Sequence, residues 1–209
     1  MYALPQMGII RSKYGNLFPK QANASRNRKP RFVEKNMKLK TKRLSIRLIN
    51  KNDWKSLIGI WNDFNHSEYA QYDVPHTETE DEARDKAKRW EEVSPGMEHV
   101  FFAVLLENEM IGYVDFHKNR NGYECGYCFH RKYHGKGYAK ESIESLIHYM
   151  SNGQNIRMIA RTALDNTPSV RLLLSLGFQK INEEQVSFYQ DYNGNDIYFK
   201  GGIFVLDVD

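Results

Sequence analysis

The sequence predicts a single α/β domain that follows a basic N-terminal extension. Two observations lead to this prediction. From residue 44 onward, segments that alternate apolar and polar residues, as strands do, are interleaved with segments whose apolar residues recur at helical spacing. Within residues 125–150, an apolar strand-like segment, a glycine-containing turn and a helical run follow one another. The length of 209 residues accommodates one domain and an extension.

Charge is distributed unevenly along the chain. Residues 1–36 hold eight Lys or Arg and one acidic residue, Glu34, whereas the remaining 173 residues hold 22 basic and 25 acidic ones. A basic tail can bind nucleic acid or ribosomes by counterion release; a solvated extension without a partner is the alternative. A transit peptide would also be Arg-rich, but no amphipathic helix is evident. We predict a loosely ordered extension over 1–36 and a domain over 37–209. An alternative is that the natural start is Met37, because residues 37–43 resemble the beginning of a protein.

Composition indicates a globular protein that is not inserted in a membrane. The hydrophobic content of 41% is sufficient for a packed core, and no apolar run approaches the roughly 18–20 residues of a membrane-spanning helix. Residues 1–10 lack the charged start and the apolar region of a signal peptide. With two cysteines and no such signal, we expect a reducing, cytoplasmic setting.

The first half of the predicted domain contains one strand and two helices. Residues 44–48 alternate apolar and polar side chains, which predicts a strand. Residues 50–53 offer caps for a helix that carries Trp54 and further apolar residues. A second helix is predicted over 77–92, and Thr79 is a candidate cap for it.

The second half is richer in strands. We expect strands over 99–106, 111–117, 123–130, 156–163, 185–189 and 197–206, and helices over 139–150 and 170–176. Asn193-Gly194 is a typical hairpin turn between the last two strands. Pro168 suits the first turn of the second of these helices, and Gly177 suits its C-terminal end.

The turn before the helix at 139–150 predicts an anion site. Unpaired N–H groups and the helix dipole meet at a helix start, and glycines let a ligand approach the backbone closely. The turn consists of His134, Gly135, Lys136, Gly137, Tyr138 and Ala139. An ordinary strand-to-helix turn is the alternative when this motif is taken alone. Lys136 either adds charge for a phosphate or is solvated.

Three blocks in this order resemble the GNAT superfamily of N-acetyltransferases, in its ribosomal-protein and spermidine N-acetyltransferase branch. The blocks are the glycine turn, Asn166-Thr167-Pro168-Ser169 and Leu176-Gly177-Phe178. The resemblance covers roughly residues 39–208. It implies a mixed, mostly antiparallel sheet of about six or seven strands flanked by helices, with acetyl-CoA bound between two splayed parallel strands.

The resemblance also implies which residues bind acetyl-CoA. The pyrophosphate is expected on residues 134–139, and the pantetheine arm against backbone near Cys128 and Phe129. His134 replaces the family's usual Gln or Arg, and its backbone N–H is expected to serve instead. Asn166 matches a position that contacts the pantetheine arm. The alternative is that Asn166 or Ser169 caps the following helix.

The reaction implied is attack of a neutral amine on the thioester, which needs a base, an oxyanion donor and an acid. The backbone N–H near Phe129 matches the family's oxyanion donor. The family's tyrosine acid is replaced by Leu173, so Ser169 is the candidate acid. Glu124 is the candidate base, because a carboxylate in a closed site can have a raised pKa. Asp115, a water chain, or a merely structural role for Glu124 are the alternatives.

Two further clusters bear on the site. Cys125, Cys128, His130 and His134 lie within ten residues, as zinc ligands do, but a strand directs residues 125 and 128 to opposite faces, so we predict no metal. Acidic residues between 68 and 81 lie where the family covers its acceptor pocket: Glu68, Asp73, Glu78, Glu80 and Asp81. They would attract a cationic amine, or simply form the acidic first turn of a helix.

We therefore predict acetyl-CoA-dependent transfer to a primary amine. A protein N-terminus, a polyamine or other small amine, and an amine-bearing antibiotic are the candidate acceptors. A non-catalytic acyl-CoA sensor is one alternative, and the absent tyrosine at Leu173 favours it. A ribosome- or nucleic-acid-binding protein that acts through residues 1–36 is the other. The sequence leaves open whether the protein is a monomer or a homodimer.

Overall fold

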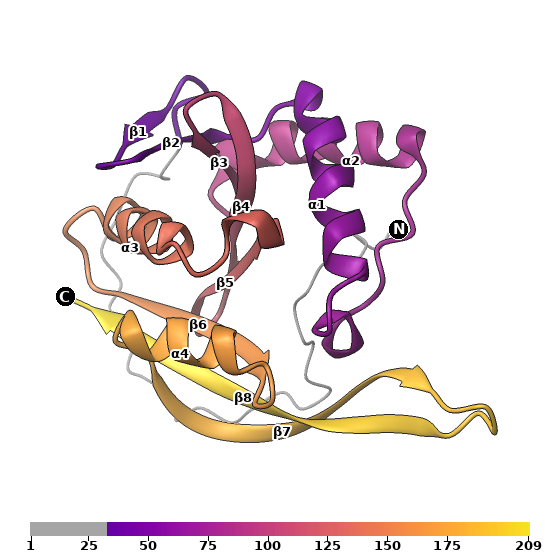
Figure 1. The fold of residues 1–209 in the computed structure, drawn as a ribbon. Coiled ribbons are helices and arrows are strands. Elements are labelled where there is room, and N and C mark those ends of the chain that lie inside the picture. The colour runs from indigo at the N-terminus through magenta and orange to yellow at the C-terminus, as the bar shows by residue number, and fades with distance from the viewer. Residues whose placement is uncertain (1–32) are drawn as a thin grey trace.

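A single eight-stranded sheet forms the centre of the protein (Figure 1). The structure is a computed structural model, and it describes residues 33–209. The strands are β1 (Lys38–Lys40), β2 (Leu44–Leu48), β3 (His99–Leu106), β4 (Glu109–Asn119), β5 (Gly122–Phe129), β6 (Ile156–Ala163), β7 (Gln179–Gln190) and β8 (Asp196–Val208). The helices are α1 (Trp54–Asn65), α2 (Glu80–Val93), α3 (Tyr138–Ser151) and α4 (Thr167–Ser175).

The strand order is β1-β2-β3-β4-β5-β6-β8-β7, and every neighbouring pair is antiparallel except β5 and β6, which are parallel. The predicted mixed, mostly antiparallel sheet is confirmed. It has eight strands rather than six or seven, because the short strand β1 pairs with β2. Three residues are too few for an alternating pattern to stand out in the sequence.

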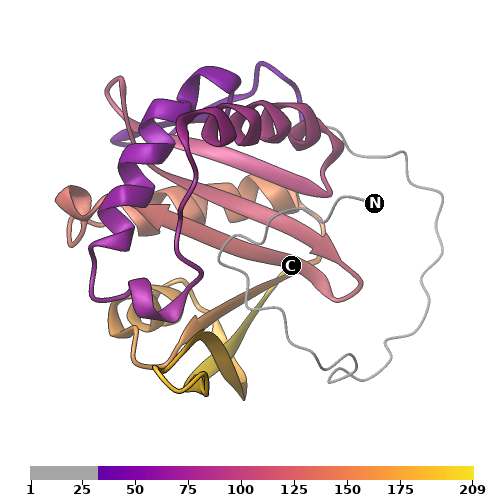
Figure 2. The same ribbon diagram turned by 90° about the vertical axis from the view of Figure 1, so that its right-hand side faces the viewer.

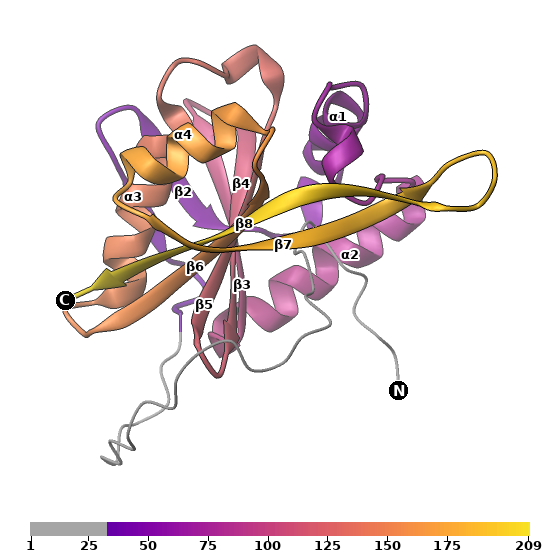
Figure 3. The ribbon, with the colours of Figure 1, turned by 90° about the horizontal axis from the view of Figure 1, so that it is seen from below.

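Helices cover both faces of the sheet. In Figure 3, α1 and α2 lie on one side of the strands and α3 and α4 on the other, and Figure 2 shows α1 and α2 passing over their face. Successive strand residues serve the two layers in turn. On β3, for example, Phe101 packs with Trp61 and Trp90 of α1 and α2, whereas Phe102 packs in the cluster that contains Ile143 of α3.

Local signals in the sequence fix several element ends. Thr79 caps α2 in a reciprocal capping box with Glu82, so this helix begins at Glu80 rather than at residue 77. Pro168 lies in the first turn of α4, as predicted. Gly177 follows α4 with φ of 89°, the left-handed conformation predicted for it.

β7 and β8 form a long hairpin that projects beyond the other strands (Figure 1). The predicted turn at Asn193-Gly194 is present, with Gly194 at φ 83°. The hairpin also reaches the segment between α1 and α2, because the Tyr189 hydroxyl donates to the carbonyls of Ala70 (2.9 Å) and Asp73 (2.7 Å). This contact holds that segment against the hairpin.

The described chain begins with packed residues. Val33 is 2% exposed, and its N–H donates to the carbonyl of Pro95. Ordered packing therefore extends at least four residues before the predicted boundary at residue 37, and the prediction for residues 1–32 lies outside the described part. Across residues 33–209 no helix is both long enough and apolar enough to cross a membrane.

Candidate active site

The glycine turn joins the end of β5 to the start of α3. Gly135 has φ of 71° and Gly137 has φ of 79°, a conformation that side chains disfavour. Gly137 is the N-cap of α3, and no side chain caps the helix start. The N–H groups of the first turn, from Tyr138 and Ala139 onward, therefore lack an intrahelical partner. A Cβ on Gly135 would meet nothing within 4 Å, so the loop is open there.

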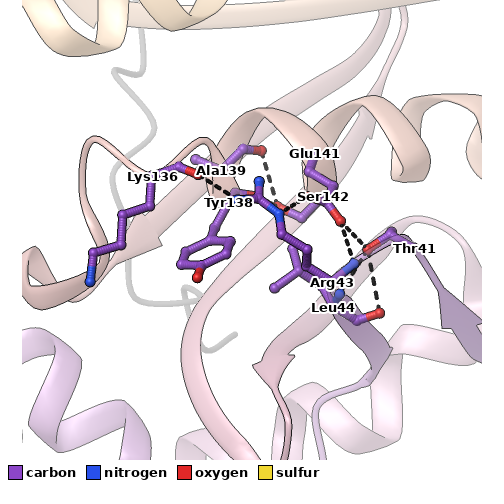
Figure 4. A network of polar contacts seen from close by, with 8 residues as sticks. All are labelled: Thr41, Arg43, Leu44, Lys136, Tyr138, Ala139, Glu141 and Ser142. Carbon is purple, nitrogen blue, oxygen red and sulfur yellow. Dashed lines mark hydrogen bonds and ion pairs between the residues drawn. The ribbon is translucent and has the colours of Figure 1, made fainter.

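A polar network fixes this turn to the β1–β2 hairpin (Figure 4). The Glu141 carboxylate accepts hydrogen bonds from Thr41 Oγ1 (2.6 Å), Arg43 N (2.8 Å) and Arg43 Nε (2.7 Å). Arg43 Nη1 in turn donates to the carbonyl of Lys136 (2.8 Å). Partial burial raises the pKa of Glu141, but the hydrogen bonds from Thr41 and Arg43 outweigh burial and lower it. The Lys136 side chain points away from this network.

His134 shapes the loop from inside. Its Nε2 lies 2.8 Å from the carbonyl oxygen of Phe129, to which it donates, and its backbone N–H donates to the carbonyl of Arg131 (3.0 Å). The expectation that the His134 N–H is offered to a phosphate is therefore wrong for this conformation. The imidazole instead ties the start of the turn to the last residue of β5.

β5 and β6 diverge beside the loop. Their parallel pairing consists of two residue pairs and ends at Glu124 and Ile159. β5 nevertheless continues to Phe129 and β6 to Ala163. We call the facing, unpaired edges of residues 125–129 and 160–163 the β5–β6 opening.

Strand geometry decides which backbone groups face this opening. His130 N–H donates to the carbonyl of Ile111 on β4, and antiparallel partners alternate between pairs that exchange hydrogen bonds and pairs that do not. The N–H and C=O of Cys128 therefore point to β4, whereas those of Tyr127 and Phe129 point to the opening. The N–H of Phe129 therefore faces the opening, whereas the backbone groups of Cys128 pair with β4. Tyr127, rather than Cys128, turns both its N–H and its C=O to the opening.

The far wall of the opening is the start of α4. Asn166 is its N-cap, and its side-chain oxygen accepts from Ser169 N (3.3 Å). The capping role is thus present, and the amide NH₂ of Asn166 is a separate donor. Ser169 Oγ lies 2.6 Å from the hydroxyl oxygen of Tyr127. Leu173 is 1% exposed and packs in the core. Its side chain is aliphatic and cannot donate a proton.

The candidate base lies on the sheet face that α1 and α2 cover. Glu124 is buried, and Arg161 Nε is 3.1 Å from its Oε1, close enough for an ion pair but not aligned for a hydrogen bond. Arg161 Nη1 donates to both carboxylate oxygens of Glu184. Burial raises the pKa of Glu124, against the opposing charges of Arg161 and His117.

Asp115, the alternative base, lies next to Glu124 on this face. His117 Nε2 is 3.0 Å from Asp115 Oδ1, and His117 is the cross-strand partner of Glu124. Asp115 is paired with Gly126, and a Cβ on that glycine would lie 2.6 Å from Asp115 Oδ1. The Asp115 carboxylate can therefore lie over residue 126 only because that residue is a glycine.

A third carboxylate comes from the segment between α1 and α2. Burial raises the pKa of Asp73 to about 6, against the hydrogen bond from Val74 N–H, and Asp115 raises it further. Asp73 also raises the pKa of the Cys128 thiol, which places it near the end of β5. The sequence predicted only that Asp73 belongs to an acidic group; its partial enclosure depends on the hairpin that holds the segment.

Three other acidic residues of that group, Glu78, Glu80 and Asp81, have structural roles. Glu78 forms an ion pair with Lys86, and its pKa falls to about 2 because hydrogen bonds from His76 and Lys86 outweigh the effect of burial. Glu80 and Asp81 form the acidic first turn of α2, the alternative interpretation of these residues.

The two cysteines point to opposite faces. Cys125 packs in the core cluster beneath α3, and Cys128 packs against the cluster beneath α1 and α2. Both are free thiols. Within residues 33–209 no three His, Cys, Asp or Glu side chains are grouped as metal ligands.

The fold and the site together define an acetyltransferase. Residues 43–179 match the domain family described as "Acetyltransferase (GNAT) domain", and the chain belongs to the GNAT family. It is 34% identical over 148 residues to "Uncharacterized N-acetyltransferase p20" of Bacillus licheniformis, covering 68% of this chain and 82% of that one. It is 31% identical over 149 residues to "Uncharacterized N-acetyltransferase YnaD" of Bacillus subtilis (strain 168), covering 69% and 84%.

Solved structures share the fold. RimL, a ribosomal L7/L12 alpha-N-protein acetyltransferase in complex with coenzyme A, aligns with a TM-score of 0.68 at 17% identity, over 81% of this chain and 96% of that one. The GNAT resemblance is thus confirmed, and ribosomal-protein acetyltransferases are among the structural neighbours.

Proposed function

We propose that this protein transfers an acetyl group from acetyl-CoA to a primary amine. The β5–β6 opening beside the glycine turn carries this proposal. The backbone N–H and C=O of Tyr127 and the N–H of Phe129 face this opening, and the N–H groups at the start of α3 lie beside it. Such a site suits a ligand that combines amides with a pyrophosphate, and coenzyme A has both.

The residues present fit this ligand. The N–H groups at residues 135–139 would hold the pyrophosphate, with Lys136 nearby, and the Asn166 amide would contact the pantetheine arm. When bound, acetyl-CoA supplies an activated acetyl thioester. Phe129 N–H faces the opening and is the proposed oxyanion donor. Ser169 supplies a hydroxyl near the departing sulfur.

Glu124 is the proposed base. Burial raises its pKa and so makes the carboxylate a stronger base, which would take a proton from an ammonium ion directly or through water. Arg161 opposes that shift, so Asp115 stays the alternative. Single variants decide between them: Glu124→Gln and Asp115→Asn are compared for kcat at saturating acetyl-CoA, and the base is the residue whose loss lowers kcat by about 100-fold or more.

The acceptor is proposed to be cationic. Asp73, Asp115 and Glu124 lie on the α1–α2 side of the sheet, and negative charge there favours an ammonium group. A protein N-terminus, a polyamine or other small amine, and an amine-bearing antibiotic meet this requirement. The name of RimL, which acts on a ribosomal protein, supports including N-terminal peptides. The free thiols are consistent with a cytoplasmic setting.

One experiment tests the proposal. The melting temperature is measured with increasing acetyl-CoA, and thiol release is then followed with polyamines, amine-bearing antibiotics and N-terminal peptides. Ligand at a hundredfold excess over Kd stabilises the folded state by about 2.7 kcal/mol. Stabilisation with thiol release on one amine class is expected.

Two other results of this experiment would contradict acetyl transfer. Stabilisation without thiol release would support the sensor, the alternative that Leu173 favours, and no stabilisation would refute the site. For the tail alternative, removal of residues 1–32 would abolish a salt-dependent association with ribosomes or RNA.

A further inference from the structure

A tyrosine that the proposed mechanism leaves unused lies at the β5–β6 opening. The Tyr127 side chain starts from β5, and its hydroxyl oxygen is 2.6 Å from Ser169 Oγ in the first turn of α4. This contact links the two walls of the opening. Tyr127 and Ser169 are each partly buried.

The placement supplies a group that the end of the reaction needs. When the C–S bond of the thioester breaks, the electron pair stays on sulfur, and a proton donor stabilises the departing thiolate. Leu173 cannot donate one. An aliphatic hydroxyl such as that of Ser169 is a far weaker acid than a phenol, whose ordinary pKa is about 10.

We propose that Tyr127 is the proton donor to the departing thiolate and that Ser169 positions its hydroxyl. This rests on the proposed acetyl transfer. The phenol O–H gives its proton to sulfur, which yields the free thiol of coenzyme A and a tyrosinate. The base releases to solvent the proton that it took from the ammonium, and the tyrosinate regains a proton from solvent, with Ser169 as its hydrogen-bond partner, before the next cycle.

The surroundings of Tyr127 keep the phenol protonated before the thiolate departs. Burial raises the pKa of Tyr127, and the hydrogen bond from Ser169, which stabilises the anion, acts in the opposite direction. The alternative is that the Tyr127–Ser169 contact only fastens α4 to the sheet. The two roles differ in how they respond to the acidity of the leaving group.

The test compares Tyr127→Phe with wild type on two donors, acetyl-CoA and the corresponding selenoester. A selenolate is a much better leaving group and needs little help from an acid. Tyr123→Phe is the matched control, since Tyr123 lies on the same face of β5 at the end that is paired with β6. We expect Tyr127→Phe to lower kcat about 100-fold with acetyl-CoA, less than about threefold with the selenoester, and to leave the Kd of coenzyme A unchanged.

Ser169→Ala is the second variant, and it keeps the phenol in place. We expect a smaller loss of kcat with the same dependence on the donor. Equal losses on both donors, or no loss in Tyr127→Phe, would overturn the assignment while leaving acetyl transfer intact. If wild type releases no thiol with any amine, the proposed function fails, and this assignment fails with it.

Discussion

Glu141 makes the attachment of the glycine turn to the β1–β2 hairpin testable. Its carboxylate accepts three hydrogen bonds, one from Thr41 and two from Arg43. Glu141→Gln keeps the shape of the side chain but removes the charge, and its NH₂ group would face donors. A hydrogen bond to a charged group contributes about 1.5–3 kcal/mol. The Arg43 side chain is 40% exposed, so its ion pair contributes only about 0.2–1 kcal/mol.

Together these magnitudes predict a loss of about 2 kcal/mol in the free energy of unfolding at neutral pH. For a domain of this size, that lowers the melting temperature by about 4–8 °C. Glu144→Gln, an exposed position on the same helix, is the control and should leave the melting temperature unchanged. Coenzyme A should also bind more weakly to Glu141→Gln, because Arg43 no longer holds the Lys136 carbonyl firmly.

The pH dependence gives a second check. The folded-state pKa of Glu141 is lowered, so its stabilising contribution is present above the pKa of the unfolded chain and is lost as the pH falls through the folded-state value. The difference between wild type and Glu141→Gln should therefore shrink in acid. Equal melting temperatures for the Glu141 and Glu144 variants at neutral pH, or a difference that stays constant into acid, would refute this reasoning.

Three other predictions address the site. Gly137→Asp should abolish coenzyme A binding in a calorimetric titration, since it sets a carboxylate against the phosphates at a residue with φ of 79°; an unchanged Kd would show that the loop has another role. Glu124→Gln should lower kcat most toward higher pH, where the wild-type carboxylate is ionised and can accept a proton, and a wild-type pH profile would exclude it as the base. Asp73 has a folded-state pKa raised to about 6, so stability falls as the pH rises from about 4 to 6. Asp73→Asn should remove that part of the urea-midpoint pH profile and stabilise the protein at pH 7, and an unchanged profile would contradict the enclosed carboxylate.

Sequence patterns predicted most elements of the fold because each depends on local contacts. The strand at residues 44–48 and the strand at 156–163 have the predicted limits. The first alternates because one side is buried, whereas the second is an apolar strand buried on both sides at residues 158–160. β7 instead begins at Gln179, six residues before the predicted start. Its first part is largely exposed and pairs with β8, so pairing rather than an apolar pattern makes it a strand.

Long-range geometry accounts for what the sequence did not reveal at the site. That Tyr127 meets Ser169, 42 residues later, depends on how α4 packs beside β5. The ion pair of Glu124 with Arg161 depends on β6 lying next to β5. The sequence places Cys128 just before the glycine turn, and we therefore expected its backbone to contact the ligand. The sequence does not reveal which residues of β5 form hydrogen bonds with β4, and that alternation turns the Cys128 backbone away from the opening.

The divergence of β5 from β6 also has a consequence for the mechanics of the protein. Strands β1–β5 and strands β6–β8 form two sub-sheets whose direct connection is two residue pairs. A ligand with strand-like amides would form hydrogen bonds with the edges of β5 and β6 where the two strands do not pair with each other. The bound ligand would therefore connect the two sub-sheets. Backbone amides at Tyr127 and Phe129 should then exchange with solvent deuterium readily in the free protein and slowly in the complex. Binding of this ligand would thus make the whole sheet more rigid.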